Sequence, residues 1–389
     1  MRGHAEIVGA GFAGLTAAAA LLRQGWTVRV HERSASLRSE GFGIAIQENG
    51  LRTLDALGIG EQIRSKAVNI VRRVICDAKG NIASDLALSR SPIRVSRRDV
   101  IDAMSDIITA QGGDIVTRSE IAEVAADGTV KGSDGRSYRG DVVIGADGIN
   151  SRIRDSLGVP VRRILSSDGA MRLVIPRADN HRSAEGTTYE HWSGARRLIC
   201  SPCSPTELYI ALSSPASDTA SRTVPFDRTS WSASFPHLTG LFDRMAAHAD
   251  WSGVLWSQFQ TIRLSSWRAD NVAFVGDAAH AMTPNLGQGG GCAMMNAFSL
   301  AQSLASAGDV PTALTDWEAR ERPLIEHTQL WSRIYGAVTR LPESVRSLAL
   351  KAAARPGWLQ TQLQRAAGHV PYGSVPFPSS GGMQQGVHK

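Results

Sequence analysis

Hydrophobic and polar positions change their period twice within the first 31 residues. Residues 5–9 form a short apolar run, and residues 12–24 form an Ala- and Leu-rich segment of helical length that ends before Gly25. Residues 26–31 then alternate between apolar and polar positions, which is the period of a β-strand. This order predicts a strand, a helix and a second strand, and therefore a βαβ unit with parallel strands.

The rest of the chain divides into an α/β part and a β-rich part. Helical periodicity returns at 49–57 and 98–111, strand-like runs with turns at Gly128 and Gly135 follow, and β-rich runs dominate from about 160 to 265. The α/β pattern resumes at 271–276 and in a helical segment from about 290 to 305. We therefore predict an α/β fold in which a Rossmann-like domain is interrupted by a β-sheet substrate domain and followed by helices. The predicted parts are residues 1–160 with 266–330, residues 161–265, C-terminal helices at 331–370, and a flexible tail at 371–389.

Composition and charge narrow the class of protein. The chain has 389 residues, with 42 Lys and Arg against 36 Asp and Glu, so its net charge of +6 is a mild excess. Pairs such as Arg72-Arg73 and Arg196-Arg197 are scattered and are expected mainly on solvated faces, which argues against a nucleic-acid partner. No apolar run approaches the roughly 18 residues of a membrane span, and the N-terminus does not resemble a secretion signal. We expect a cytoplasmic protein without a membrane partner.

The four cysteines add one constraint. Cys200 and Cys203 have the spacing of a redox pair or of half a zinc site, but no second CxxC and no nearby His pair accompanies them. Packing in a strand and turn is the better interpretation, so we predict neither a metal site nor a disulfide framework.

The first predicted strand ends in a glycine motif that indicates a bound dinucleotide. Gly9-Ala-Gly-Phe-Ala-Gly14 lies between a strand and a helix, which is the context in which GxGxxG spacing carries meaning. Gly9 permits a tight turn, Gly11 lets the backbone approach a pyrophosphate, and Gly14 allows close helix packing. Glu32 ends the next strand, where a carboxylate can accept hydrogen bonds from ribose hydroxyls. The residues expected at this end of the cofactor are Gly9, Gly11, Ala13, Gly14, Glu32 and Arg33.

Two later strands end in acidic turns. Residues 143–148 form a buried strand and an Ala-Asp147-Gly turn, and residues 271–277 repeat the design with a Gly-Asp277 turn. Each strand delivers one carboxylate to its end, where it suits the hydroxyls of a ribose or ribityl chain. The loop after the second turn contains Gly289 and Gly290, whose backbone N–H groups would reach a flat ring at the start of a helix.

The glycine motif and the two acidic turns, in this order and spacing, resemble the para-hydroxybenzoate hydroxylase-type family of FAD-dependent aromatic monooxygenases over about residues 5 to 330. The resemblance implies that the Rossmann-like domain binds FAD and that NAD(P)H reduces it without a second Rossmann domain. It further implies that Glu32 holds the adenosine ribose, that Arg97 contacts the flavin or its phosphates, and that Asp277 contacts the ribityl or pyrophosphate region. Asp147 is implied in both FAD and nicotinamide contacts, and Pro284 would lie beside the reactive edge of the flavin.

Residues 11–22, 168–176, 201–203 with 207–209, and 278–300 carry a narrower similarity. These stretches resemble the oxygenases of this family that act on 2-methyl-3-hydroxypyridine-5-carboxylate. This similarity implies that Arg197 and Tyr209 hold a substrate carboxylate, as an Arg and a Tyr on neighbouring strands can do by charge-assisted hydrogen bonds. The alternative is that Arg197 is a surface charge and Tyr209 a core aromatic. Ala45 and Gln47 stand where that group has aromatic residues, and Thr283 stands where it has a cysteine. The residues expected to line the substrate site are Arg197, Tyr209, Trp256, Ala45, Gln47 and Thr283.

The sequence therefore predicts an FAD-dependent, NAD(P)H-consuming monooxygenase for a hydroxylated aromatic carboxylate, with a hydroxypyridine carboxylate as the favoured ring. By the resemblance, O2 adds at the flavin C4a to give a hydroperoxide that hydroxylates the ring, and ring opening can follow. No protein base is assigned, because a structural role for His280 is at least as well supported as a catalytic one. The alternatives are a benzenoid hydroxybenzoate-type hydroxylase, a halogenase or reductase of the same fold, and a non-catalytic FAD-binding protein.

Overall fold

The βαβ unit predicted at the start of the chain is present in the computed structural model, which describes residues 2–37, 42–88, 90–178 and 186–374. It consists of β1 (His4–Val8), α1 (Phe12–Arg23) and β2 (Thr27–His31), and the two strands pair in parallel. Most of the predicted flexible tail, residues 375–389, lies outside the described residues.

This unit belongs to a six-stranded sheet with the order β18-β19-β12-β1-β2-β8. Its strands run parallel except for β18, which pairs antiparallel with β19. Because parallel strands end at the same edge of a sheet, the turns after β1, β12 and β19 lie close together. These turns carry Gly9, Asp147 and Asp277. The other strands are β8 (Asp114–Val116), β12 (Val142–Gly145), β18 (Arg268–Ala269) and β19 (Val272–Phe274).

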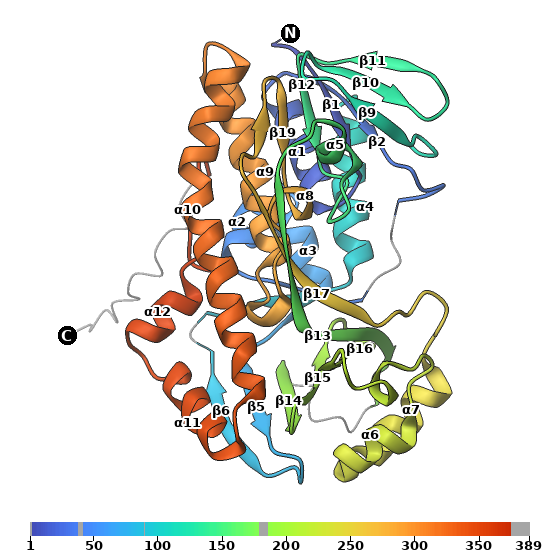
Figure 1. The fold of residues 1–389 in the computed structure, drawn as a ribbon, viewed down its shortest axis with the longest axis vertical. Helices are drawn as coiled ribbons and strands as arrows, with labels where there is room; N and C mark the ends of the chain where they lie inside the picture. Colours follow the sequence, from blue (N-terminus) through green and yellow to red (C-terminus); the bar gives the residue numbers. More distant parts are fainter. Residues whose placement is uncertain (1, 38–41, 89, 179–185, 375–389) are drawn as a thin grey trace, which may run out of the picture.

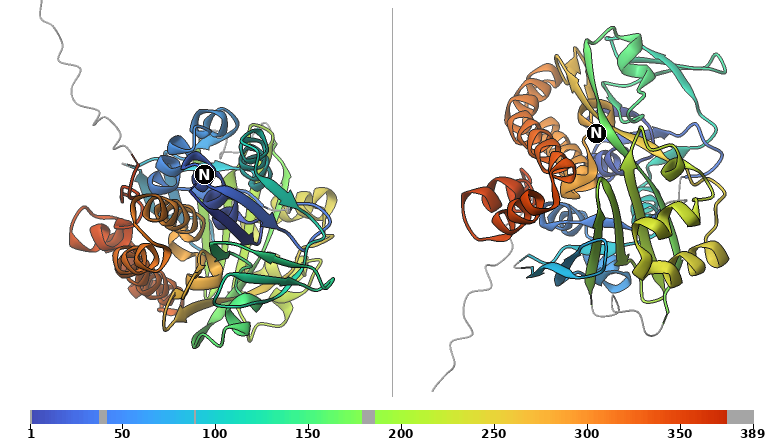
Figure 2. Two further views of the ribbon diagram at one scale, coloured as in Figure 1. Left: turned by 90° about the horizontal axis from the view of Figure 1, so that it is seen from above. Right: turned by 60° about the horizontal axis from the view of Figure 1, so that its bottom comes forward.

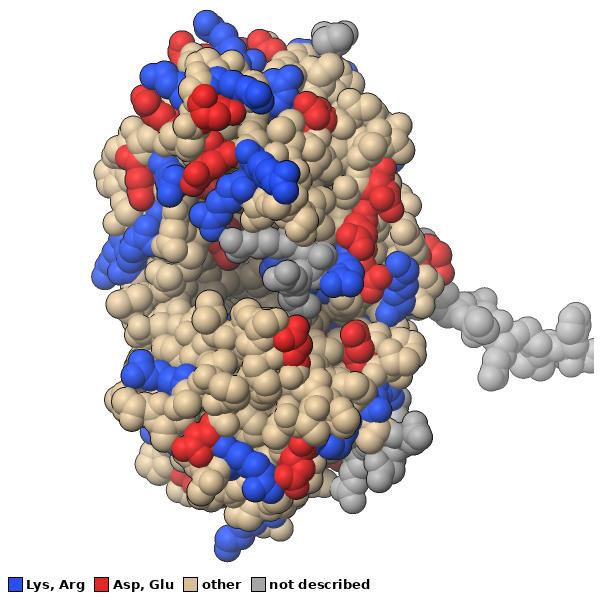
Figure 3. Space-filling view, turned by 90° about the vertical axis from the view of Figure 1, so that its right-hand side faces the viewer, with Lys and Arg blue, Asp and Glu red and all other residues tan. Residues whose placement is uncertain are grey.

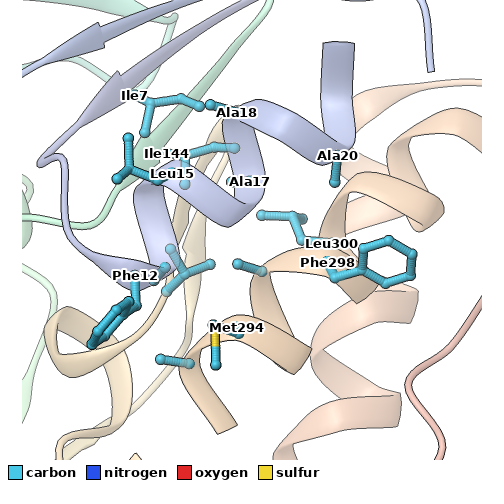
Figure 4. Close-up of a cluster of buried hydrophobic side chains, with 14 of the residues drawn as sticks. Ile7, Phe12, Leu15, Ala17, Ala18, Ala20, Ile144, Met294, Phe298 and Leu300 are labelled. Atoms are coloured by element: carbon cyan, nitrogen blue, oxygen red, sulfur yellow. The ribbon is translucent and has the colours of Figure 1, made fainter. Parts of the chain in front are cut away.

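The hydrophobic core beside this sheet is centred on α1 and α9 (Gly289–Ser306), as Figure 4 shows. Ala17, Ala18 and Ala20 of α1 are fully buried, and so is Leu300 of α9. Such small side chains let two helices approach closely, and a helix that is apolar on nearly all sides is a buried one. The packing fixes the N-termini of both helices, where the sequence places the cofactor.

A second sheet of seven strands has the order β17-β13-β16-β15-β14-β5-β6. Its neighbours are antiparallel except for β14 and β5, which run parallel. Two of its strands, β5 and β6, come from residues outside the range 161–265 that the sequence assigns to the substrate domain. The strands are β5 (Arg72–Cys76), β6 (Ile82–Ala87), β13 (Val161–Pro176), β14 (Thr187–Ser193), β15 (Arg196–Pro202), β16 (Glu207–Pro215) and β17 (Ser257–Leu264).

Two three-stranded sheets and several helices complete the described fold. The predicted hairpin turns at Gly128 and Gly135 are confirmed by the antiparallel pairing of β9, β10 and β11. The small sheets are β3 (Ile44–Ile46), β7 (Ile93–Val95) and β4 (Val68–Asn69), and β9 (Ile121–Val124), β10 (Thr129–Gly132) and β11 (Ser137–Arg139). The helices are α2 (Glu48–Ala56), α3 (Gly60–Lys66), α4 (Arg97–Ala110), α5 (Arg152–Ser156), α6 (Arg228–Ser234), α7 (Thr239–His248) and α8 (Asp277–His280).

The C-terminal region is helical and lies along one side of the molecule (Figures 1 and 2). It contains α10 (Val310–Ala337), α11 (Glu343–Ala354) and α12 (Trp358–Gln364), and α11 lies beside β6. The predicted α/β fold with a helical C-terminal region is therefore confirmed. Among the described helices, none combines the length and apolarity that crossing a bilayer requires. On the face seen in Figure 3, side chains of both charges are interspersed around a hollow.

All four cysteines are buried free thiols. Cys200 and Cys203 belong to different hydrophobic clusters, and burial raises the pKa of each thiol to about 12. Neither thiol is therefore a ready thiolate nucleophile or metal ligand. Within the described ranges there is no group of three or more His, Cys, Asp or Glu residues that could hold a metal ion.

Candidate active site

The glycine motif forms a turn that leaves part of its backbone open. Gly9 has a φ of +107°, which L side chains rarely adopt. A Cβ at Gly14 would lie 1.9 Å from the carbonyl oxygen of Gly9, so only glycine lets α1 pack this closely against the turn. A Cβ at Gly11 would meet no atom within 4 Å. The turn therefore presents an unobstructed backbone at Gly11, where the sequence places a pyrophosphate.

A groove of ≈ 420 Å³ opens at this turn and gathers residues from distant parts of the chain. The predicted cofactor residues in its lining are Gly9, Gly11, Glu32, Arg33, Arg97, Asp147 and Asp277. Ala13 lies behind the turn with only 7% of its surface exposed, and a Cβ on Gly276 would come within 2.8 Å of its Cβ. The sheet edge thus brings the glycine motif, Glu32 and both acidic turns to one place.

Glu32 is held with its carboxylate beside the glycine turn. Its Oε2 accepts a hydrogen bond from the Ala10 N–H at 3.1 Å, and its Oε1 accepts one from the Ser34 N–H at 2.9 Å. These bonds fix the orientation and leave further lone pairs on both oxygens. The carboxylate can therefore accept hydrogen bonds from ribose hydroxyls.

Asp147 has one satisfied and one unsatisfied carboxylate oxygen. Its Oδ2 accepts hydrogen bonds from the N–H groups of Arg152 and Ile153, at 2.8 and 3.3 Å, at the start of α5. Its Oδ1 is buried and has no hydrogen-bond partner among the described residues. Burial raises the pKa of Asp147. A buried acceptor without a partner is costly, so a hydroxyl donor from a cofactor in this groove fits the site.

Asp277 is the first residue of α8 and its side chain faces the groove. Gly276 before it has φ +60° and ψ −142°, a conformation that a side chain would strain. The Asp277 side chain is exposed toward the groove, and protein atoms surround it on its other sides. The desolvation that they cause raises the pKa of Asp277, and the charge of Arg97 opposes that rise. The Arg97 guanidinium lies over the Phe12 ring at 4.7 Å. The Asp277 carboxylate and the Arg97 guanidinium thus face the same groove. A carboxylate can accept hydrogen bonds from the hydroxyl groups of FAD and a guanidinium can bind its phosphates, so the residues present fit FAD.

The loop between the cofactor turn and α9, together with the first residues of α9, contains the predicted flavin contacts Pro284, Gly289 and Gly290. Pro284–Leu286 form a 3-10 turn, and Gly287 has a φ of +63°. A Cβ at Gly290 would lie 2.6 Å from Ile44 Cδ1, whereas a Cβ at Gly289 would meet only Met282 at 4.0 Å. A side chain at Gly290 would therefore require Ile44 to move, whereas Gly289 leaves the backbone accessible at the N-terminus of α9.

A second cavity, of ≈ 250 Å³, opens beside this loop. Four predicted site residues lie in its lining: Pro284, Ala45, Gln47 and Arg197. The cavity runs from the loop past β14 and β15 to β5, β6, α11 and α12. The structure therefore places the predicted flavin edge and part of the predicted substrate site in one space.

A buried ion-pair network lies in the wall of this cavity. Glu190 Oε2 accepts hydrogen bonds from Arg197 Nε at 2.9 Å and pairs with its Nη2 at 2.7 Å, while Oε1 accepts from Arg73 Nε at 2.7 Å. Arg73 also donates to the Tyr335 hydroxyl of α10. Burial by itself would raise the pKa of Glu190, but the charges of Arg197 and Arg73 outweigh it and hold the pKa at about 2. One carboxylate thus serves two guanidinium groups, and the network keeps a net positive charge.

Sequence reasoning missed Arg73 and Glu190. Arg72 and Arg73 were expected on a solvated face, yet only Arg72 is exposed, where it pairs with Asp85. Because successive side chains of a strand point to opposite faces, one arginine of such a pair must point inward when that face of the sheet is covered. Glu190 stands among Tyr189, His191 and Trp192 on β14, and no motif in the sequence marks its position.

Tyr209 is not among the described residues that line this cavity. Arg197 of β15 pairs in register with Ser213 of β16, and Tyr209 pairs with Ser201. Four residues along a strand separate the two side chains by about 13 Å. The Tyr209 ring lies under the guanidinium of Arg94 at 4.5 Å. That Arg197 and Tyr209 bind the same substrate carboxylate stays a prediction, and the register of β15 and β16 does not favour it.

Arg94 is a further cavity residue that sequence reasoning missed. It lies on β7 opposite Ala45 of β3, and both line the cavity. Its Nε is buried and has no hydrogen-bond partner in the described part of the chain. Burial lowers the pKa of Arg94, against the effect of Tyr209. An arginine so placed can donate hydrogen bonds to an oxygen in the cavity.

Trp256 and Thr283 lie away from the described lining of this cavity. Trp256 Nε1 donates to the Ser214 hydroxyl at 3.1 Å and packs against the cluster under α6 and α7. The Thr283 hydroxyl lies 2.8 Å from the Ser332 hydroxyl of α10, and Thr283 lines a different groove. Their predicted contacts with a substrate stay predictions.

His280 is buried behind the cofactor turn. Its Nε2 lies 3.2 Å from Asn296 Oδ1, and its ring packs against Trp267. Burial lowers the pKa of His280 to about 4, although the Asn296 hydrogen bond acts against it. A neutral, enclosed imidazole is consistent with the structural role considered from the sequence.

The chain is similar to known proteins over nearly its whole length. A family model described as an FAD binding domain matches residues 4–326. A Rhodococcus erythropolis protein named "Putative 2-heptyl-3-hydroxy-4(1H)-quinolone synthase" is 38% identical over 377 residues, which cover 95% of this chain and 97% of that protein. The 2-heptyl-3-hydroxy-4(1H)-quinolone synthase of Mycobacteroides abscessus is 36% identical over 366 residues, with coverage of 91% and 95%.

The chain is also similar in structure to a solved protein. The tetrameric form of 2-methyl-3-hydroxypyridine-5-carboxylic acid oxygenase superposes with a TM-score of 0.85 at 34% identity, covering 96% of this chain and 98% of that one. Together with the family model, this likeness confirms the resemblance that the three motifs indicated.

Proposed function

This chain belongs to the FAD binding domain family and is an FAD-dependent aromatic monooxygenase, and from this premise we propose that it hydroxylates carbon 3 of a 2-alkyl-4(1H)-quinolone. The net reaction converts ring–H, O2, NAD(P)H and H⁺ into ring–OH, H2O and NAD(P)⁺. One oxygen atom of O2 enters the ring and the other leaves as water, and the reducing hydride comes from NAD(P)H. Bound FAD supplies the redox chemistry that links NAD(P)H to O2.

The lining of the second cavity carries this proposal. Its aliphatic side chains include Ile70, Ile75, Leu86, Leu88, Ile199, Leu286, Leu350 and Leu363. Arg197 is already paired with Glu190, so binding a small acid there would require the acid to compete with a buried carboxylate. An apolar ring gains about 25 cal/mol for each Å² that it buries against such a surface. The cavity therefore suits a ring with an aliphatic substituent better than a small, highly charged one.

The residues of the chain bind and orient the ring. The Pro284–Leu286 turn and the strands β14 and β15 would hold it between them, and the aliphatic lining would exclude water. Arg94 would donate a hydrogen bond to the oxygen at carbon 4. This bond would orient the ring and stabilise negative charge on that oxygen when the ring N–H ionises to solvent, and the ring anion is more nucleophilic at carbon 3 than the neutral ring. Because a guanidinium stays protonated, Arg94 stabilises negative charge without giving up a proton.

Substrate-stimulated oxidation of NAD(P)H tests the proposal. Purified holoenzyme would be supplied separately with 2-heptyl-4(1H)-quinolone and with 2-methyl-3-hydroxypyridine-5-carboxylate, and the products identified by mass spectrometry. We expect the quinolone to accelerate NAD(P)H oxidation and to yield the 3-hydroxy product. NAD(P)H oxidation without a hydroxylated quinolone would reject this substrate class.

A second candidate is hydroxylation of a hydroxypyridine carboxylate, with or without ring opening. Two observations favour it: Arg197 lies in the cavity lining, and the network of Arg73, Glu190 and Arg197 keeps a net positive charge. A carboxylate could pair with Arg197 if Glu190 kept its bond to Arg73. Coupled turnover of the pyridine acid, and not of the quinolone, would select this candidate.

A further inference from the structure

One wall in the outer half of the second cavity is built by residues that follow the region matched by the family model. The family model ends at residue 326, whereas Tyr335, Leu350, Ala353, Leu363 and Ala367 all line this cavity. These residues belong to α10, α11, α12 and the segment after α12. This wall of the cavity is therefore formed by residues that follow the region matched by the family model.

The surfaces that face each other across this half are aliphatic. Ile75 of β5 and Leu86 of β6 lie on one side, and Leu350, Ala353 and Leu363 of the C-terminal helices lie on the other. Figure 1 shows α11 beside β6, and α11 also contacts α12. Leu350 is 6% exposed, and Ile75 and Leu363 belong to its hydrophobic cluster. The walls are thus packed hydrophobic surfaces and not loose side chains at the protein surface.

This half of the cavity has few polar groups, and each of them is either uncharged or paired with an opposite charge. Ser84, Gln360 and Gln364 line it without charge, and Arg90 is ion-paired with Glu48. The buried charges of Arg73, Glu190 and Arg197 lie on β5, β14 and β15. The charged network and the aliphatic walls thus separate the cavity into two chemically different parts.

We propose that the space between the β5–β6 ribbon and the helices α11 and α12 binds the saturated aliphatic chain of the substrate and sets its preferred length. This inference rests on the proposed function, because the ring at the flavin loop is what directs a substituent outward. The chain would lie against Leu86, Ala353 and Leu363, and water would be displaced along its length. Burial of one methylene changes an equilibrium about fourfold, so affinity should rise by up to that factor for each methylene that the cavity encloses.

The experiment uses holoenzyme and 4(1H)-quinolones that carry 2-methyl, 2-propyl, 2-pentyl or 2-heptyl groups. Dissociation constants come from the perturbation of the flavin absorbance, and kcat/KM comes from product formation. We expect the dissociation constant to fall by up to about fourfold for each added methylene until the cavity is filled. Equal dissociation constants for the methyl and heptyl compounds would overturn the inference.

A matched pair of substitutions on α11 locates the effect. Ala353 lines the cavity, whereas its neighbour Ala352 is exposed and is not part of the described lining. Ala353→Phe should weaken heptyl binding by about 10-fold or more and leave methyl binding nearly unchanged, and Ala352→Phe should change neither. If Ala353→Phe does not fold, Leu363→Ala replaces it, and the loss should again be confined to the long-chain compounds. A loss that is equal for the methyl and heptyl compounds would remove the C-terminal helices from the chain-binding site.

The two proposals fail in different ways. Binding that strengthens with chain length but yields no hydroxylated quinolone would reject the proposed reaction and retain the aliphatic site. Hydroxylation of the methyl and heptyl compounds with the same kcat/KM and the same affinity would retain the reaction and reject the site.

Discussion

Two alanine substitutions in the glycine motif should separate cofactor binding from folding. Gly11 has φ −86° and ψ −175°, which any residue can adopt, and an added Cβ would meet no atom within 4 Å. An added Cβ at Gly14 would lie 1.9 Å from the Gly9 carbonyl oxygen, well inside the closest approach of real atoms. The same chemical change therefore meets open space at one position and backbone at the other.

The expected magnitudes follow from these contacts. Gly11→Ala should leave the free energy of unfolding of the apoprotein unchanged or raise it by up to about 1 kcal/mol, because alanine restricts the unfolded chain. It should weaken FAD binding by about 10- to 150-fold, since the methyl group stands where the pyrophosphate would receive a charged hydrogen bond of about 1.5 to 3 kcal/mol. Gly14→Ala should lower the free energy of unfolding by about 1 to 3 kcal/mol or more, as overpacking does.

The assay needs two measurements on each variant. Urea unfolding of the apoprotein gives the free energy of unfolding, and quenching of flavin fluorescence during titration gives the dissociation constant of FAD. If Gly11→Ala bound FAD as tightly as the unmodified protein, the pyrophosphate would not lie at this turn. If Gly14→Ala unfolded at the same urea concentration as the unmodified protein, the close packing of α1 would be wrong.

Three further substitutions test other parts of the site. Asp277→Ala should weaken FAD binding by about 10- to 150-fold without a change in the secondary structure seen by circular dichroism, and unchanged affinity would make Asp277 purely structural. Under the second candidate, a hydroxypyridine carboxylate, Arg197→Met should raise the dissociation constant of that acid by about 10- to 1,000-fold and that of its uncharged parent ring little, with normal flavin content; equal losses would place Arg197 away from the ligand. Because the pKa of His280 falls to about 4 on folding, the folded state loses stability as the pH drops from 6.5 to 4, and the loss is complete below that range. Between pH 7 and pH 5 the protein should therefore lose about 2 kcal/mol of unfolding free energy more than His280→Gln, and equal losses would show that His280 is not held neutral.

The elements near the cofactor could be predicted because their signals are local. The glycine motif, the Ala-rich helix and the two strands occupy one continuous stretch, and the observed α1 at Phe12–Arg23 ends one residue before the prediction. Asp147 and Asp277 end parallel strands of one sheet, and parallel strands bring their carboxyl ends together without further information. For this reason one groove collects both acids with Gly9.

The substrate cavity could not be predicted in the same way, because it depends on strand pairing between distant segments. Arg73 and Glu190 are 117 residues apart and meet only because β5 pairs with β14. Register also separates Arg197 from Tyr209 along neighbouring strands, and sequence spacing does not define register. The walls formed by α11 and α12 depend in turn on where those helices pack, which no motif in the chain encodes.

Isotope labelling of the product tests the central claim most directly. Holoenzyme, NAD(P)H and 2-heptyl-4(1H)-quinolone would be incubated under oxygen-18 gas, and the product would be analysed by mass spectrometry. A monooxygenase that acts at carbon 3 predicts a 3-hydroxy product with one oxygen-18 atom, formed in step with the NAD(P)H consumed. A hydroxyl group that carries oxygen from water, or NAD(P)H oxidation that yields only hydrogen peroxide and unaltered quinolone, would contradict the account.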